Sequence, residues 1–233
     1  MESNFQNFYS RQESRLLKDF DRIIHQIKGE IISRFGVEQT DELIHVSRDE
    51  YRRLIPDLPF VGGRQPFTQF VITTGWCLAL HRALGGKATS ARESGELFFE
   101  LARQYINQVP ALVRRYLGTS MFTQRYQRKL RERALESQQH PLPRGYIFSY
   151  IEGEKENYDF GVDYHRCATL NFLREQGAVE IAPYLCALDQ YSSDLLGWGL
   201  VRTTTLAEGG EVCDFRFKKG GPTRIRSTVL ELR

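Results

Sequence analysis

Three cysteines fall in the last third of the chain, close to side chains that can move protons. Cys167 stands where a predicted strand passes into a predicted helix, so its thiol would face unpaired backbone N–H groups and the positive end of the helix dipole. Both effects favour the thiolate, which is the nucleophilic and metal-binding form of cysteine. His165, two residues earlier, could act as its base. The alternative is a small core cysteine beside a surface histidine, and spacing alone favours that alternative.

Asp189 is the best candidate for a general acid or base. It lies three residues after Cys186 on a predicted helix, so the two side chains share one face. It also follows the apolar run 185–188, which would direct it toward the core, where a carboxylate must find a partner or take up a proton. A half-exposed aspartate near the end of the helix is the other interpretation, and the sequence does not choose between the two.

A predicted hairpin near the C-terminus carries groups that could hold a substrate. Strand alternation in 212–217 places Cys213 and Asp214 on opposite faces of the sheet. In the strand predicted over 200–206, Arg202 and Thr204 share a face, where a guanidinium could bind a carboxylate in bidentate geometry. An ordinary Arg–Asp pair across two strands is the alternative that spacing favours.

Metal binding has weaker support. The side chains that could supply ligands for zinc or a similar metal are His165, Cys167, Cys186, Asp189 and Cys213. Their spacing fits no standard structural zinc motif. The cofactor therefore stays unknown, and a divalent metal is an option that the sequence does not require.

Composition limits the class of protein. The 233 residues include 41% hydrophobic and 26% charged side chains, as in an ordinary globular chain, and a formal net charge of +3 does not argue for nucleic acid. The basic segment 114–133 could bind phosphate or nucleic acid, but such a segment is more often a solvated helix face. The first 15 residues contain no apolar h-region, so we expect no signal peptide. The sequence has no membrane-length apolar run and no CxxC pair, which together predict a cytoplasmic protein with reduced thiols.

Helices dominate the predicted elements of the first 140 residues. The evidence is apolar spacing of three and four residues, punctuated by Gly and Pro. Thr40 is predicted to be the N-cap of the second helix. The predicted helices are 10–35, 40–54, 66–84, Thr89 or Ser90 to Ile106, and 111–138 in one or two pieces.

Alternation replaces helical spacing beyond the Pro-rich segment 138–145. The predicted elements follow the order ββααββ, with one further strand at the end. They cover 146–152, 158–164, 167–176, 179–196, 200–206, 212–217 and 224–232. We therefore predict a single α+β domain over residues 1–233: a helical part over about 1–140, then an antiparallel sheet covered by helices over about 141–233.

The C-terminal region carries a pattern with three parts. A cysteine precedes an apolar helix, a P-x-L-C-x-x-D helix follows, and R-T-x-T-L-A-x-G-x-x-x-C-D-F comes last. This pattern resembles the L-2-amino-thiazoline-4-carboxylic acid hydrolase family over about the last third of the chain. The resemblance implies hydrolysis at a C–N bond of a heterocyclic or amide-like substrate, or a related cyclisation or ring opening in natural-product biosynthesis. The implied site positions are Cys167, Cys186, Asp189, Arg202, Thr205 and Cys213.

Three hypotheses follow, and the third of them is an interaction scaffold that binds nucleic acid through the basic segment 114–133. In the first, the chain is a small-molecule enzyme in which the Cys167 thiolate, or a metal-bound water, attacks an electrophilic carbon while Asp189 or His165 moves the proton. In the second, it is a small-molecule or metal-binding sensor module without turnover. The enzyme requires a cavity that Cys167 shares with a proton-transfer group, and it could act as a homo-oligomer. The expected substrate-binding residues are Arg202, Thr204, Thr205, Cys186 and Cys213.

Overall fold

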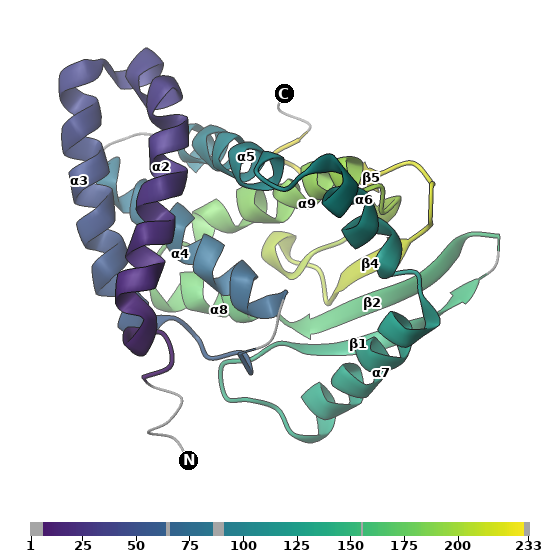
Figure 1. Cartoon of the computed structure of the whole chain (residues 1–233). Coiled ribbons are helices and arrows are strands. Elements are labelled where there is room, and N and C mark those ends of the chain that lie inside the picture. Colours follow the sequence, from purple (N-terminus) through teal and green to yellow (C-terminus); the bar gives the residue numbers. More distant parts are fainter. Residues whose placement is uncertain (1–6, 64–65, 86–90, 155, 231–233) are drawn as a thin grey trace.

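The computed structural model describes residues 7–63, 66–85, 91–154 and 156–230. Helices make up the first part of the chain, and a five-stranded sheet with further helices makes up the second (Figure 1). The predicted α+β class is confirmed. The helices of the first part are η1 (Ser10–Gln12), α2 (Glu13–Phe35), α3 (Val37–Leu54), η2 (Ile55–Asp57), α4 (Phe67–Ala83), α5 (Ala91–Asn107), α6 (Ala111–Ser120) and α7 (Gln124–Gln139).

Helices α2 and α3 lie side by side as an antiparallel pair, and α4 and α5 connect this pair to the second part of the chain (Figure 1). The buried side chains of α2 recur every three or four residues, from Leu16 to Ile31, as the apolar spacing predicted. Helix α2 ends at Gly36, whose φ of 80° is unfavourable for other residues. Helix α4 is buried on nearly every side, because α3, α5 and α8 all pack against it.

The predicted helix boundaries of the first part agree only in part with the structure. Helix α3 begins at Val37, so the prediction that Thr40 is its N-cap is wrong. Thr40 lies inside the helix, where its hydroxyl donates to the Gly36 carbonyl at 2.6 Å. The residues predicted to cap α5, Thr89 and Ser90, lie outside the described residues. The segment 111–138 forms two helices, one of the two predicted arrangements.

The sheet has the strand order β1-β2-β4-β3-β5. Three of its pairings are antiparallel, as predicted, but β5 runs parallel to β3, so the sheet is mixed. The strand predicted over 200–206 ends at Arg202, and the last predicted strand is reduced to two residues. The elements of this part are β1 (Ile147–Glu154), β2 (Tyr158–Arg166), α8 (Ala168–Glu175), η3 (Val179–Ile181), α9 (Ala182–Leu196), β3 (Leu200–Arg202), η4 (Leu206–Glu208), β4 (Cys213–Phe217) and β5 (Arg224–Ile225).

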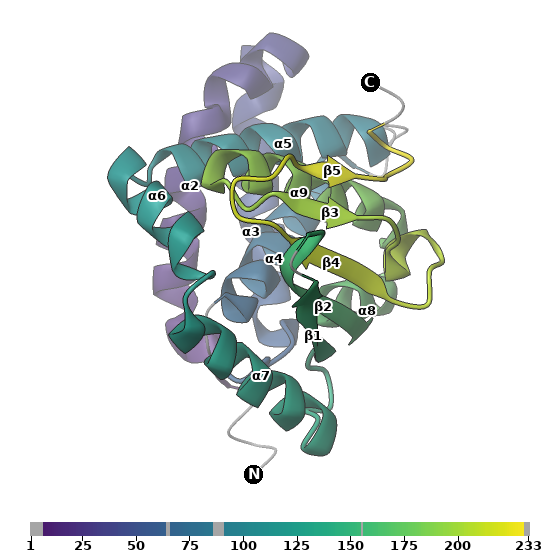
Figure 2. The same ribbon diagram turned by 90° about the vertical axis from the view of Figure 1, so that its right-hand side faces the viewer.

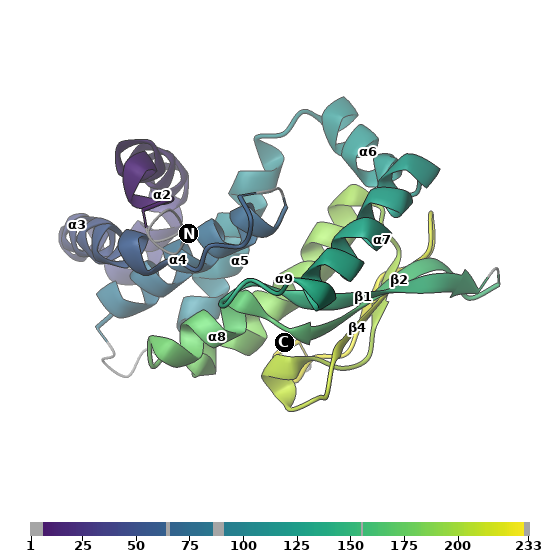
Figure 3. The same ribbon diagram turned by 90° about the horizontal axis from the view of Figure 1, so that it is seen from below.

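One face of the sheet is covered by α7, α8 and α9 (Figures 2 and 3). The other face carries exposed and half-buried polar side chains. The register places Tyr164 opposite Cys213, so both side chains point to the covered face. Asp163 is paired with Asp214, and both point to the open face. Within the described residues, no helix combines the length and the apolar character needed to cross a membrane.

Helices α5 and α9 cross so closely that only glycine fits at position 95. A Cβ atom on Gly95 would lie 2.1 Å from Cδ1 of Tyr184. We expect Gly95→Ala to lower the free energy of unfolding by about 1–3 kcal/mol, because the tyrosine ring must move. Gly29→Ala in α2 is the matched control: no atom lies within 4 Å of its Cβ, and alanine should stabilise the helix by about 0.5–1 kcal/mol. Urea unfolding of both variants measures the difference. A change of the same sign in the free energy of unfolding of both variants would contradict the close crossing of α5 and α9.

Candidate active site

Side chains from four elements meet on the covered face of the sheet. Cys167 is the N-cap of α8, Cys186 and Asp189 lie on α9, Arg202 ends β3 and Cys213 begins β4. Asp189 interacts electrostatically with all three thiols, and Cys167 interacts with the other two. We call these five residues the thiol–aspartate cluster.

Cys167 has the donors expected of a thiol at a helix N-terminus. Its Sγ lies 3.0 Å from Oγ1 of Thr169, and the backbone N–H groups of Thr169 and Leu170 also lower its pKa. Burial has the larger effect and the Asp189 carboxylate adds to it, so the pKa of Cys167 is raised. The expectation of a stabilised thiolate is therefore wrong for the protein without a ligand, in which Cys167 is a neutral thiol.

Asp189 and Arg202 form an ion pair beside the thiols. Nη1 of Arg202 donates to Oδ2 of Asp189 and, at 3.0 Å, to the backbone carbonyl of Cys186. Burial raises the pKa of Asp189 to about 6, although the neighbouring guanidinium acts in the opposite direction. The Arg202 side chain is 1% exposed and that of Asp189 32% exposed. Asp189 is thus an ionised carboxylate at neutral pH, with a pKa close enough to neutrality for proton transfer.

Arg202 also carries donors that no described residue uses. Its Nε and Nη2 atoms are buried and have no hydrogen-bond partner in the described protein. These two N–H groups lie on one edge of the planar guanidinium, the edge that matches both oxygens of a carboxylate. Leaving buried donors without a partner costs roughly 1–3 kcal/mol each, so a ligand that satisfies them gains that interaction.

Aromatic side chains surround the cluster. The Tyr164 ring packs edge-to-face on Phe215, with 5.4 Å between centroids, and the Arg202 guanidinium lies 5.5 Å from the Phe215 centroid. Burial raises the pKa of both Tyr164 and Tyr146, so both hydroxyls stay protonated. Neither tyrosine was predicted as a site residue, although strand alternation along β2 places Phe160, Val162 and Tyr164 on one face.

His165 does not join the cluster. It is exposed on the open face of the sheet, where Nε2 lies 2.8 Å from Oγ of Ser149 on β1. Because successive side chains of a strand point to opposite faces, His165 points away from the face that Tyr164 and Cys213 share. The prediction that His165 serves as the base for Cys167 therefore fails on geometry.

The threonines after β3 organise a turn. Thr205 is buried, accepts the Glu208 N–H and donates its hydroxyl to Oε2 of Glu208 at 3.1 Å. Thr204 lies beyond the end of β3, so the prediction that it extends the Arg202 face of the strand is wrong, and its N–H donates to Asp214. The turn directs the N–H of Leu206 to Sγ of Cys213 at 3.2 Å. Its observed contacts therefore position Cys213.

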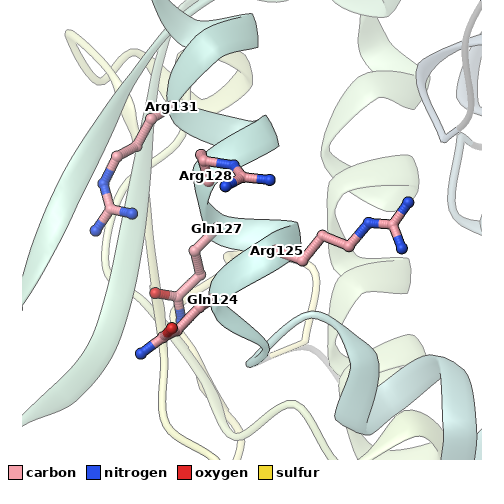
Figure 4. Close-up of a pocket in the computed structure, with 5 residues that line it drawn as sticks. All are labelled: Gln124, Arg125, Gln127, Arg128 and Arg131. Carbon is pink, nitrogen blue, oxygen red and sulfur yellow. The ribbon is translucent and has the colours of Figure 1, made fainter.

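The described residues include a surface pocket but no preformed metal site. No group of three or more His, Cys, Asp or Glu side chains in the described part of the chain is arranged to hold a metal ion. A surface pocket of about 670 Å³ lies along α7 (Figure 4). Its lining residues are Gln124, Arg125, Gln127, Arg128 and Arg131.

Comparison with known proteins identifies the family of the chain. A model of the L-2-amino-thiazoline-4-carboxylic acid hydrolase family matches residues 85–217, which is more than half of the chain. The match includes every residue of the thiol–aspartate cluster and begins well before the last third of the chain, which holds the motifs that resemble this family. Searches of curated proteins and of solved structures found no match. The chain belongs to the L-2-amino-thiazoline-4-carboxylic acid hydrolase family.

Proposed function

We propose that the chain is a hydrolase-like enzyme that opens, or in the reverse direction closes, a small heterocyclic or amide-like substrate at a C=N or C=O carbon. The thiol–aspartate cluster is its active site. The observation that carries this proposal is the buried, unpartnered edge of Arg202 beside a thiol and a carboxylate whose pKa is about 6. Such a combination supplies an anchor, a nucleophile and a proton carrier within one site.

Substrate binding begins at the guanidinium. The N–H groups on the free edge of Arg202 donate hydrogen bonds to a carboxylate of the substrate, while Nη1 keeps Asp189 in place. The rings of Phe215 and Tyr164 provide an apolar wall against which a flat heterocycle can lie. A bound carboxylate on Arg202 competes with Asp189 for the positive charge, which raises the proton affinity of Asp189 further.

The chemistry then proceeds through a covalent adduct on Cys167, which water hydrolyses. Sγ of Cys167 adds to the electrophilic carbon as Asp189 takes the thiol proton and passes it to the substrate nitrogen. Collapse of the adduct breaks one ring bond, and the leaving atom takes up the proton from that nitrogen. Water then displaces Cys167 from the carbon, which consumes one water and restores the thiol. Because the thiol is neutral before the substrate binds, Asp189 must accept its proton during the attack.

The test is turnover of L-2-amino-thiazoline-4-carboxylate, with N-carbamoyl-L-cysteine measured by mass spectrometry. We expect Arg202→Lys to raise KM about tenfold or more, because an ammonium group cannot replace a bidentate edge. Arg216→Lys is the matched control, since Arg216 pairs with Asp163 at 2.6 Å and is not in the cluster.

Equal KM values for the two variants would contradict the anchoring role of Arg202. The proposed function itself fails if neither this compound nor any of a panel of heterocyclic carboxylates is bound or converted.

A further inference from the structure

Helix α6 presents its apolar side chains to solvent. Leu112 and Tyr116 are 82% and 69% exposed, and Val113 and Leu117 are also exposed. These four residues are spaced by one and four positions, so they form one continuous stripe along the helix. Single exposed apolar residues are common on protein surfaces, but a contiguous stripe marks an interaction site.

The packed side of α6 lies opposite this stripe. Gly118 is the one residue of α6 that is buried, and a Cβ atom there would lie 1.8 Å from the carbonyl oxygen of Leu196 in α9. At 100° per residue, the stripe from Leu112 to Leu117 is centred about half a turn from Gly118. Helix α6 therefore contacts the body of the protein through a small residue and turns its apolar face outward.

Positive charge concentrates around the stripe. Residues 111–139, which contain α6 and α7, hold seven Arg or Lys and two Glu, whereas the whole chain has a net charge of +3. The rest of the chain is therefore net negative. Arg115, Arg125 and Arg128 form no ion pair with any residue that the structure describes. The two helices, joined by a turn over 121–123, follow one another along one edge of the molecule (Figures 2 and 3).

The surface pocket on α7 is also lined by arginines. All five of its lining residues belong to α7, and the guanidinium groups of Arg125 and Arg131 point to opposite sides of that helix (Figure 4). Arg131 is held by Glu152 and lies 4.2 Å from the Tyr150 centroid, which leaves Arg125 and Arg128 free for a ligand. Charges spread along a helix fit an extended anionic partner better than one small anion.

We propose that the outer surface of α6 and α7 docks an acidic amphipathic helix of a partner protein. The apolar stripe takes the apolar face of the partner, and Arg115, Arg125 and Arg128 pair with its acidic side chains. Nucleic acid would use the arginines but would leave Leu112 and Leu117 exposed. A second copy of this chain would bring the two basic surfaces together, so like-charge repulsion opposes it.

The docking surface lies on the outer side of helices that reach the thiol–aspartate cluster. Helix α9, against which α6 packs, carries Cys186 and Asp189, and Tyr126 of α7 interacts electrostatically with Tyr164. A partner bound here would sit beside the candidate active site. The docking proposal stands on surface chemistry alone and does not depend on the reaction.

The experiment measures binding of a fluorescein-labelled synthetic helix with Leu on one face and Glu on the other, by fluorescence anisotropy with the full chain. We expect the double variants Tyr116→Ser/Leu117→Ser and Arg125→Glu/Arg128→Glu each to raise Kd about tenfold or more. Val37→Ser, an exposed apolar residue of α3, and Arg226→Glu, an exposed cation of the C-terminal segment, are matched controls that should leave Kd within about twofold.

Three results would overturn the proposal. The first is equal binding of a control peptide whose Leu residues are replaced by Ser. The second is tighter binding of a mixed-sequence DNA duplex that only the arginine variant weakens, which would assign the surface to nucleic acid. The third is a concentration-dependent dimer in analytical ultracentrifugation that Tyr116→Ser/Leu117→Ser abolishes, which would assign the stripe to a second copy. Circular dichroism of each variant checks that the helices still form.

Discussion

Replacement of Cys167 by Ser should lower kcat by about 10³-fold or more while leaving substrate binding nearly intact. A hydroxyl is a far weaker nucleophile than a thiol at neutral pH, and the donors at the start of α8 cannot make up the difference. Single-turnover kinetics with the ring-opened product as readout measure this loss. Equilibrium binding of the unreacted substrate to the variant separates chemistry from affinity.

Cys186→Ser is the matched control for this experiment. Cys186 belongs to the same cluster and its pKa is also raised by burial, but it lies within α9 and has no helix N-terminus to activate it. We expect its substitution to change kcat by less than about tenfold. Comparable losses in both variants would show that the thiols act only through packing, and the nucleophilic role of Cys167 would then be withdrawn. Alkylation of Cys167 in the free protein should accelerate toward alkaline pH, because its pKa is raised.

Asp189→Asn should reduce kcat/KM by about 10²–10⁴-fold, the usual contribution of a general base. In the unsubstituted protein, kcat/KM should rise with pH through about 6, as Asp189 loses its proton and becomes able to accept one from the thiol. The amide variant should show no such rise. A pH–rate profile for both proteins, fitted between pH 4 and 8, measures the difference.

The control variant is Asp163→Asn, which breaks the half-buried Arg216–Asp163 pair of the sheet. Asp163 lies on the open face, so kcat/KM of this variant should retain the rise near pH 6.

The stability of the unsubstituted protein provides a second readout. Because the pKa of Asp189 is higher in the folded state than its ordinary value of 3.8, the unfolded chain releases this proton first, and stability falls as pH rises from about 4 to about 6. A pH–rate profile of Asp189→Asn in which kcat/KM still rises near pH 6 would assign this titration to another group.

The local structure of this protein follows from the sequence to a large extent. Apolar spacing is a property of neighbouring residues, so it located α2 to within a few residues and placed the change from helices to strands at the Pro-rich segment. The positions of Cys167, Cys186 and Asp189 at one strand–helix junction and on one helix face also follow from local geometry. The family was recognisable from the same residues.

Tertiary structure decided what sequence spacing could not. His165 is two residues from Cys167, yet the strand pleat sends it to the other face of the sheet. The pKa of Cys167 depends on how deeply the thiol is buried, and burial comes from elements far away along the chain. Thr40 has the residue type of an N-cap, but α3 begins earlier, at Val37. The free edge of Arg202 arises because α9 satisfies only one of its nitrogens, and contacts between distant elements are not encoded in any local pattern.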